Sequence, residues 1–413
     1  MTKSWKSAML AAFAAFYCVR ATAAGKGPEF PLGVWYEGGV GAFRDDLIPA
    51  DPALAAPIYL KHFRDMAAHG INCAVVPNTP PDHHQAILDA ARSADVKLII
   101  EVNKEGGDLG TMIRGGKPVS EAAINATLTR DLRPVMDHAA LWRVQLLDEP
   151  PPGTFPRYAE VAKGLKAYAR RLKPFTCLIG ADGFDEFLKT TGSDVAAFDR
   201  YPIGVGTPLG DVAAMRDFER VATKAGLACA KTGAASWAVM QVHAITGIHR
   251  FPTPGEIRCM TYLALASGSK GLFWFLYQTE YWNKAKGEMM SGLIDTDGDG
   301  DARWEEVGRL TKETRALEPT LLRLTPIASP EDTRPHATTH YLKDRKGRRY
   351  VFTVNLDTVS ARDVETRIQL PNGESSAVTR LPGGKRVAAR RQNGGLVWSE
   401  RLPAGSGALY RLD

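Results

Sequence analysis

Short apolar runs alternate with amphipathic helical stretches eight times between residues 31 and 324, and this repeat constrains the fold more than any other feature. Parallel strands buried on both faces are near-continuous apolar runs, and the helices between them have apolar residues three and four positions apart. Eight such units favour an α/β fold of the closed (β/α)8, or TIM-barrel, type. The predicted strands are Leu32–Tyr36, Ile71–Pro77, Val96–Val102, Trp142–Leu147, Phe175–Ile179, Asp194–Phe198, Ser236–Val242 and Gly271–Tyr277.

An open, doubly wound sheet is the alternative architecture. Such a sheet usually has a phosphate-binding loop of the form GxGxxG after its first strand. The first predicted strand is followed by glycines, but their spacing does not match, and Trp35, Tyr36 and Glu37 precede them. The barrel is therefore favoured over a nucleotide-binding sheet.

The pattern changes after the barrel to alternating strands separated by turns. Alternation is clear at residues 349–355, 364–370, 395–398 and 408–412, and proline and glycine cluster between these segments. We predict a barrel domain at residues 25–326 and a C-terminal all-β sandwich at residues 327–413.

Residues 1–24 have the features of an export signal. Lys3 and Lys6 precede an apolar stretch, and small residues follow it at positions 21–24. The alternative is a membrane anchor, but the apolar stretch is shorter than the ~20 residues that a spanning helix needs. We expect cleavage, a secreted or periplasmic protein, and no membrane span in the mature chain.

Charge and cysteine content limit the classes of partner. The net charge of +6 falls to +3 without the signal, whose basic residues are Lys3, Lys6 and Arg20. This charge does not indicate nucleic-acid binding, and it allows an anionic glycan without requiring one. Four scattered cysteines remain, without a zinc-binding spacing, and we predict free, buried thiols. The sequence does not indicate an oligomeric state.

Polar and aromatic side chains gather at the predicted strand ends. Barrel proteins place their chemistry at the carboxyl ends of the strands, so these positions are the candidates for a site. Amides can hold hydroxyl groups of a ligand, and aromatic rings can stack on it. The candidates for substrate binding are Trp35, Glu37, Asn78, Glu101, Asp148, Tyr201, Gln241 and Tyr277.

Three further carboxylates are candidates for catalysis. Glu149 follows the fourth strand and precedes a proline, Asp199 follows the sixth strand, and Glu280 follows the eighth. Cleavage of a glycosidic bond needs a pair of carboxyl groups, one acting as acid and the other as base or nucleophile. We therefore predict a carbohydrate substrate, with Glu149 as general acid and Asp199 or Glu280 as its partner.

Residues 30–325 resemble the barrels of the large glycoside hydrolase clan A. In that clan an acid/base glutamate closes the fourth strand in an Asn-Glu-Pro-like motif, and here the motif is Asp148-Glu149-Pro150. A tyrosine after the sixth strand often contacts the nucleophile, and Tyr201 has the matching position. Residues 250–274 resemble galactosidase-like or uncharacterised members. The resemblance implies an enzyme that hydrolyses O-glycosyl bonds.

Two residues depart from the pattern of the clan. Asp148 replaces the usual asparagine, and Gln241 stands on the seventh strand, where the clan has a glutamate nucleophile. Either the second carboxylate comes from another strand or the enzyme inverts through a more distant base. The alternative function is a non-catalytic glycan-binding or polysaccharide-assembly protein. A polysaccharide lyase is a third interpretation.

An acidic loop at residues 295–306 matches a calcium-binding spacing. Its carboxylates alternate along the chain and end in a glutamate at the twelfth position. A polar turn before the last barrel helix is the alternative. No cofactor is required for the predicted reaction, but the loop predicts a structural Ca²⁺ site with the ligands Asp295, Asp297, Asp299 and Glu306.

Overall fold

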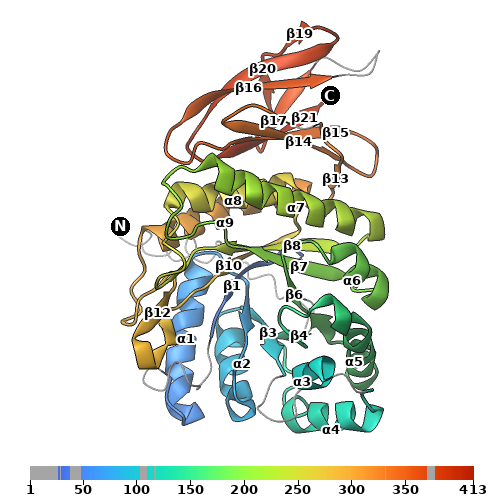
Figure 1. The fold of residues 1–413 in the computed structure, drawn as a ribbon, viewed down its shortest axis with the longest axis vertical. Helices are drawn as coiled ribbons and strands as arrows, with labels where there is room; N and C mark the ends of the chain where they lie inside the picture. Colours follow the sequence, from blue (N-terminus) through green and yellow to red (C-terminus); the bar gives the residue numbers. More distant parts are fainter. Residues whose placement is uncertain are drawn as a thin grey trace, which may run out of the picture.

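The computed structural model describes residues 27, 29–37, 48–102, 109–115, 118–330, 332–369 and 377–413. The predicted export signal at residues 1–24 lies outside the described residues. A barrel with its surrounding helices forms the lower part of the molecule in Figure 1, and an all-β module formed by the end of the chain lies above it.

Eight parallel strand positions close the barrel, which confirms the predicted fold. The sheet order begins with β5 and ends with β6, and only Thr176 separates these two strands along the chain. Because β5 pairs with β4 and β6 pairs with β7, this bent passage closes the ring. The strands are β1 (Leu32–Trp35), β2 (Cys73–Val76), β3 (Lys97–Glu101), β4 (Leu141–Gln145), β5 (Lys173–Phe175), β6 (Cys177–Ile179), β7 (Val195–Arg200), β8 (Ala235–Gln241) and β10 (Gly271–Phe275).

Helices surround the barrel, and polar caps define where several of them begin. The Thr253 hydroxyl accepts the Glu256 N–H at 3.2 Å, and the Glu256 carboxylate accepts the Thr253 N–H at 2.8 Å, a reciprocal cap on α8. None of the helices that the structure describes has the length and apolar character needed to cross a membrane. The helices are α1 (Pro52–Ala68), α2 (His84–Ser93), α3 (Leu109–Arg114), α4 (Glu121–Asp131), α5 (Phe155–Tyr168), α6 (Phe184–Thr191), α7 (Val212–Thr232), α8 (Pro254–Ala266) and α9 (Ala302–Leu321), with short 3₁₀ turns at Pro81–His83, Pro152–Thr154 and Lys284–Lys286.

Aromatic rings fill the barrel interior. Trp35 packs against Phe175, Phe273 and Phe275 with ring centroids 6.1–6.2 Å apart, and Trp237 stacks on Phe273 at 5.4 Å. A second, larger apolar layer lies between the strands and the helices. All four described cysteines are buried and free, as predicted. The barrel is therefore a packed core that opens only at its mouth.

The C-terminal module consists of two antiparallel sheets, as predicted. The first has six strands in the order β13-β14-β15-β21-β17-β18, and the second has three in the order β16-β20-β19. Val351, Ile368, Leu396, Trp398 and Tyr410 belong to the apolar cluster of this module. The strands are β13 (Thr325–Ile327), β14 (Ala337–Lys343), β15 (Arg349–Asn355), β16 (Arg362–Gln369), β17 (Val378–Leu381), β18 (Lys385–Val387), β19 (Arg390–Gln392), β20 (Gly395–Leu402) and β21 (Gly407–Leu412).

The module packs on the outer helices α7 and α8, at the side of the barrel. Two glycines bring the backbones together here. A Cβ atom on Gly255 would lie 2.0 Å from the carbonyl oxygen of Thr358, and one on Gly405 would lie 2.2 Å from that of Gly255. Arg216 on α7 donates to the carbonyl oxygens of Arg334 and Ala337 at 2.7 and 2.9 Å.

A small antiparallel sheet, which the sequence did not predict, extends from the barrel mouth. It contains β9 (Ala244–Ile245), β11 (Glu280–Asn283) and β12 (Glu288–Ser291), with β12 in the middle. We call this sheet, together with the turn at residues 246–249, the arm. Figure 1 shows β12 at the left edge of the barrel. Since β9 follows β8 and β11 follows β10, the arm lies beside the ends of two barrel strands.

Candidate active site

Glu149 follows β4 in a backbone conformation that residues other than glycine rarely adopt. Its φ angle is +48°, and its N–H donates to the carbonyl oxygen of Cys177 at 3.0 Å. Left-handed conformations at non-glycine positions cost energy and concentrate at functional sites. The side chain is exposed, so the strained turn presents the carboxyl group at the mouth of the barrel.

Asp199 lies on β7, and its carboxyl group meets that of Glu149. The two side chains interact through a hydrogen bond, and only 7% of Asp199 is exposed. Burial, together with the adjacent Glu149 carboxyl group, raises the pKa of Asp199 to about 8. The pair therefore retains one proton at neutral pH, because two charged carboxylates cannot share this site.

Asp148 adds a third carboxyl group to the same place. Burial and the nearby Glu149, Glu101, Asp199 and Glu37 raise the pKa of Asp148 well above its ordinary value. Within the described part of the chain, its Oδ1 atom is buried without a hydrogen-bond partner, and the same is true of Oδ1 of Asp199. These oxygen atoms are available to a bound ligand.

Glu37 and Asn78 form a pair at the ends of β1 and β2. The Asn78 amide donates to the Glu37 carboxylate at 3.1 Å, and Asn78 has a positive φ of +55°. Glu101 ends β3 and is 6% exposed. The structure therefore brings Glu37, Glu101, Asp148, Glu149 and Asp199 into one electrostatic cluster, as expected from their positions at the strand ends.

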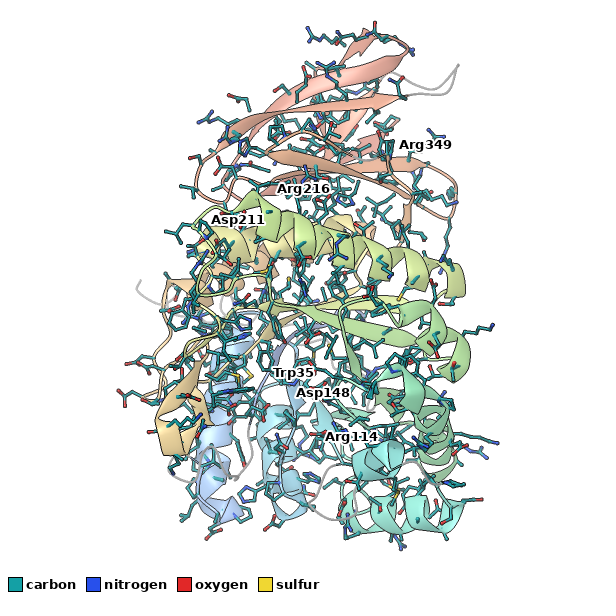
Figure 2. All side chains as sticks on the ribbon, viewed as in Figure 1. Trp35, Arg114, Asp148, Asp211, Arg216 and Arg349 are labelled. Atoms are coloured by element: carbon teal, nitrogen blue, oxygen red, sulfur yellow. The ribbon has the colours of Figure 1, made fainter. Side chains whose placement is uncertain are left out.

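A cavity of about 430 Å³ lies at this cluster. Trp35 and Asp148 lie next to each other in the middle of the molecule in Figure 2, and both line the cavity. Its walls come from the barrel strands and from the arm. The lining residues are Trp35, Asp148, Glu149, Cys177, Asp199, Tyr201, Val239, His243, Ile245, Ile248, His249, Phe275, Trp282 and Met290.

Tyr201 and two histidines form an aromatic wall of the cavity. Tyr201 stacks on Phe275 with centroids 5.5 Å apart and meets His243 edge-on at 4.8 Å. Burial and the nearby carboxyl groups, Asp199 foremost, raise the pKa of Tyr201. Tyr201 is thus a neutral hydroxyl group at the predicted place beside Asp199.

The hydrogen bonds of His243 fix the tautomers of the histidine pair. Nδ1 of His243 donates to the carbonyl oxygen of Phe275 at 2.9 Å, so its Nε2 accepts from Nδ1 of His249 at 3.1 Å. Burial lowers the pKa of His243 to about 3 and also lowers the pKa of His249. Both rings are therefore neutral at pH 7.

Six of the eleven predicted catalytic and substrate-binding residues do not line the cavity: Glu37 and Glu101, which belong to the electrostatic cluster beside it, Asn78, which donates to Glu37, and Gln241, Tyr277 and Glu280. Gln241 is fully buried and bonds to the backbone of Ile203, accepting its N–H and donating to its C=O, both at 2.9 Å. Tyr277 is 1% exposed and donates to Asp65 at 2.7 Å. Glu280 begins β11 in the arm and is 5% exposed. Gln241 thus links the end of β8 to the chain after β7, and Tyr277 links the chain after β10 to α1.

The acidic loop does not gather its carboxylates. Oδ1 of Asp295 accepts the N–H groups of Asp297 and Asp299, both at 2.9 Å. The Glu306 carboxylate is bound by Arg258 at 2.6 Å and by Arg309 at 2.7 Å. Over the described ranges of the chain, no three histidine, cysteine or acidic side chains are placed to hold a metal ion. The four predicted calcium ligands do not converge: Asp295 accepts hydrogen bonds from its own turn, and Glu306 is paired with two arginines.

The arm residues that line the cavity were not among the site residues predicted from the sequence. Ile245, Ile248, His249, Trp282 and Met290 all line the cavity. The local signal for the arm is Gly287, with φ of +66°, between two short strands. Nothing in that hairpin sequence indicates that it folds back over the ends of β4 and β7.

Comparison with known families gives a partial match. A family model described as β-galactosidase, of glycoside hydrolase family 42, matches residues 156–317, which is less than half of the chain. The matched segment contains Asp199 and Tyr201 but not Glu149. No curated protein matches the sequence.

Solved structures share the fold at low sequence identity. A Bacteroides fragilis protein provisionally named an α-galactosidase has a TM-score of 0.58 at 14% identity, over 93% of this chain and 79% of that protein. A second B. fragilis protein, provisionally named an α-galactosidase or melibiase, has a TM-score of 0.57 at 13% identity, with the same coverages of 93% and 79%. An Anoxybacillus α-amylase has a TM-score of 0.53 at 13% identity, over 93% and 98% of the two chains.

These comparisons confirm the resemblance to barrel glycoside hydrolases of the clan A type. The family match includes residues 250–274, which the sequence likened to galactosidase-like or uncharacterised members, and the structural matches extend over barrel and module together. The class of enzyme that the chain resembles is therefore the glycoside hydrolases, which cleave O-glycosyl bonds.

Proposed function

We propose that the protein is a glycoside hydrolase whose catalytic pair is Glu149 and Asp199. The contact between these two carboxyl groups in the cavity carries the proposal. Hydrolysis needs one group that gives a proton and another that stabilises positive charge at the anomeric carbon. A hydrogen-bonded pair of carboxyl groups that holds one proton can supply both, because one group carries the proton and the other carries the negative charge.

Glu149 is the general acid in this proposal. Its carboxyl group is exposed at the mouth, where the leaving oxygen of a bound glycoside would lie. The shared proton passes to Glu149 as positive charge develops on the sugar, because that charge favours the ionised form of Asp199. Protonation of the leaving oxygen accompanies breakage of its bond to the anomeric carbon.

Asp199 is the nucleophile. Its carboxylate oxygen attacks the anomeric carbon and forms a glycosyl ester as the bond to the leaving oxygen breaks. In a second step Glu149, now ionised, takes a proton from a water molecule, whose oxygen bonds to the anomeric carbon and releases the Asp199 carboxylate. Carboxyl groups in retaining enzymes are ~5–5.5 Å apart, and inverting pairs are ~6.5–9.5 Å apart to leave room for water. The hydrogen bond between Glu149 and Asp199 places the two groups closer together than either range and leaves no room for water between them, so retention is the outcome that we propose.

The experiment is hydrolysis of a panel of glycosides by the wild type and two variants. β-Galactosides come first because the matching family model describes β-galactosidases, and α-galactosides come second. Glu149→Gln and Asp199→Asn should each lower turnover by roughly 10²–10⁴-fold. Asp185→Asn is the matched control, because Asp185 is an exposed residue on α6 paired with Lys231.

Two outcomes contradict the proposal. If Glu149→Gln or Asp199→Asn keeps full activity, the substituted residue is not part of a catalytic pair. Binding of glycans without release of any sugar, by a folded wild-type protein, supports the non-catalytic glycan-binding alternative. The anomeric configuration of the first product, followed by proton NMR, tests retention separately.

A further inference from the structure

The cavity has two chemically different parts. Around Glu149 and Asp199 the lining is acidic and includes Asp148. The arm contributes mainly apolar side chains, namely Ile245, Ile248, Met290 and Trp282, of which Ile248 is 48% and Trp282 46% exposed. Large apolar groups left accessible inside a cavity indicate an apolar ligand surface.

Few polar groups are available on the arm side. Among the described residues that line the cavity, none is a lysine, arginine, asparagine, glutamine, serine or threonine. His249 is the polar side chain that the arm contributes, and its Nδ1 is occupied by His243. A ligand group lying on the arm would therefore meet hydrocarbon and an indole ring.

The chemistry of this lining indicates whether the ligand group that binds on the arm is a second sugar or an apolar group. A sugar lying on the arm would find few hydrogen-bond partners among these side chains, so its hydroxyl groups would gain little there over their contacts with water. An apolar group of the same size would gain roughly 25 cal/mol for each Å² removed from water. The volume of about 430 Å³ also lies near the lower end of the range for small-molecule pockets, ~300–1,000 Å³.

We propose that the arm is a subsite for an aromatic leaving group, so that the substrates are small glycosides with an aromatic aglycone. This inference rests on the proposed function. The sugar lies at Glu149 and Asp199, and the aglycone ring lies against Trp282 and Ile248. An aglycone ring has no hydroxyl groups that need partners on the arm, and this distinguishes such a substrate from an oligosaccharide.

Arg303 holds the arm in place before any ligand arrives. Its guanidinium group donates to the carbonyl oxygens of Val242, after β8, and Gly292, after β12, the latter at 2.8 Å. It also pairs with Asp301 at 2.7 Å and lies 3.7 Å from the centre of the Phe251 ring. A subsite that is already ordered loses little entropy on binding.

The test compares leaving groups of similar chemical reactivity. Benzyl glycosides, methyl glycosides and disaccharides of one sugar all release an aliphatic alcohol, so differences in rate report binding in the subsite. The wild type should prefer the benzyl glycoside to the disaccharide by at least tenfold in kcat/KM. Trp282→Ala should lower kcat/KM for the benzyl glycoside about tenfold more than kcat/KM for the methyl glycoside, mainly through KM.

Val359→Ala is the matched control, because Val359 is a 67% exposed apolar residue in the C-terminal module. A disaccharide preferred over the benzyl glycoside overturns the proposal. So does a Trp282→Ala variant that loses benzyl and methyl hydrolysis equally.

Failure of the proposed function gives a different result. If no glycoside is hydrolysed, calorimetry measures binding of benzyl and methyl β-galactoside to the wild type and to Trp282→Ala. Tighter binding of the benzyl compound that disappears in the variant supports the subsite without catalysis. Equal binding of both compounds, or no binding, contradicts it.

Discussion

Gln241 and Ile203 exchange two hydrogen bonds of 2.9 Å, which tie the end of β8 to the chain that follows β7. The amide oxygen of Gln241 accepts an N–H, and its amide nitrogen donates to a C=O. A carboxylate could not make the second bond, since it has no proton to donate. Glutamine at this position therefore has a structural role, which is its pairing with the backbone of Ile203.

Gln241→Glu should not increase activity. The substitution places a carboxylate at a position with 0% exposure and turns it against the Ile203 carbonyl oxygen. We expect a loss of on the order of 2–4 kcal/mol in the free energy of unfolding, measured by denaturant titration. A stable variant with higher turnover than the wild type would show that Gln241 occupies the position of a lost nucleophile.

The pH dependence of kcat/KM should have its alkaline limit near the pKa of Asp199, which is about 8. The pair must enter the reaction with one proton, so activity is present below this pKa and is lost as the pH rises through it. A pH series with a fixed glycoside measures the limit. A rate that continues to rise between pH 8 and pH 10 is incompatible with a shared proton on this pair.

Asp199→Asn should stabilise the protein, and more so at higher pH. In the folded chain Asp199 keeps its proton up to about pH 8, whereas in the unfolded chain it releases the proton above about 3.8. Unfolding therefore releases a proton between these values, and the contribution of this group to stability falls as the pH rises. We expect the variant to exceed the wild type by on the order of 1–3 kcal/mol at pH 8.

Denaturant titrations at pH 5 and pH 8 test this stability prediction. The difference between the variant and the wild type should be smaller at pH 5 than at pH 8. A constant difference, or a variant less stable than the wild type at pH 8, would contradict a protonated, buried Asp199.

Addition of Ca²⁺ should change the melting temperature by less than about 1 °C. A ligand stabilises a protein only in proportion to its binding. Of the loop carboxylates, Asp295 already accepts turn N–H groups, and Glu306 is paired with Arg258 and Arg309. Thermal denaturation of chelator-treated protein, with and without millimolar Ca²⁺, provides the measurement. A rise of several degrees would show that the loop rearranges around the ion.

The barrel could be predicted because each of its strands is recognisable from a short stretch of the sequence. Each barrel strand is an apolar run, and the observed boundaries lie within two residues of the predicted ones. Knowledge that chemistry lies at strand ends then sufficed to select Glu149 and Asp199, which the structure brings into contact. The contact itself depends on the closed ring and could not be deduced from either strand alone.

The rest of the site depends on long-range geometry. Glu280 seemed to extend the last barrel strand, but β10 ends at Phe275 and the chain then enters the arm. Gln241 has a structural role because it meets Ile203, 38 positions away in the sequence. Neither relationship has a local sequence pattern, since both arise only when distant segments pack together.

The backbone contact between Gly255 and Gly405 limits how genes for such proteins can recombine. A Cβ atom at either position would overlap a carbonyl oxygen of the other domain, so a module from another lineage would not fit on α8 unless it had glycine at the matching turn. Exchange of the module alone is therefore expected to disturb this contact. An enzyme engineer who exchanges the module as an independent cassette would have to redesign α8 along with it.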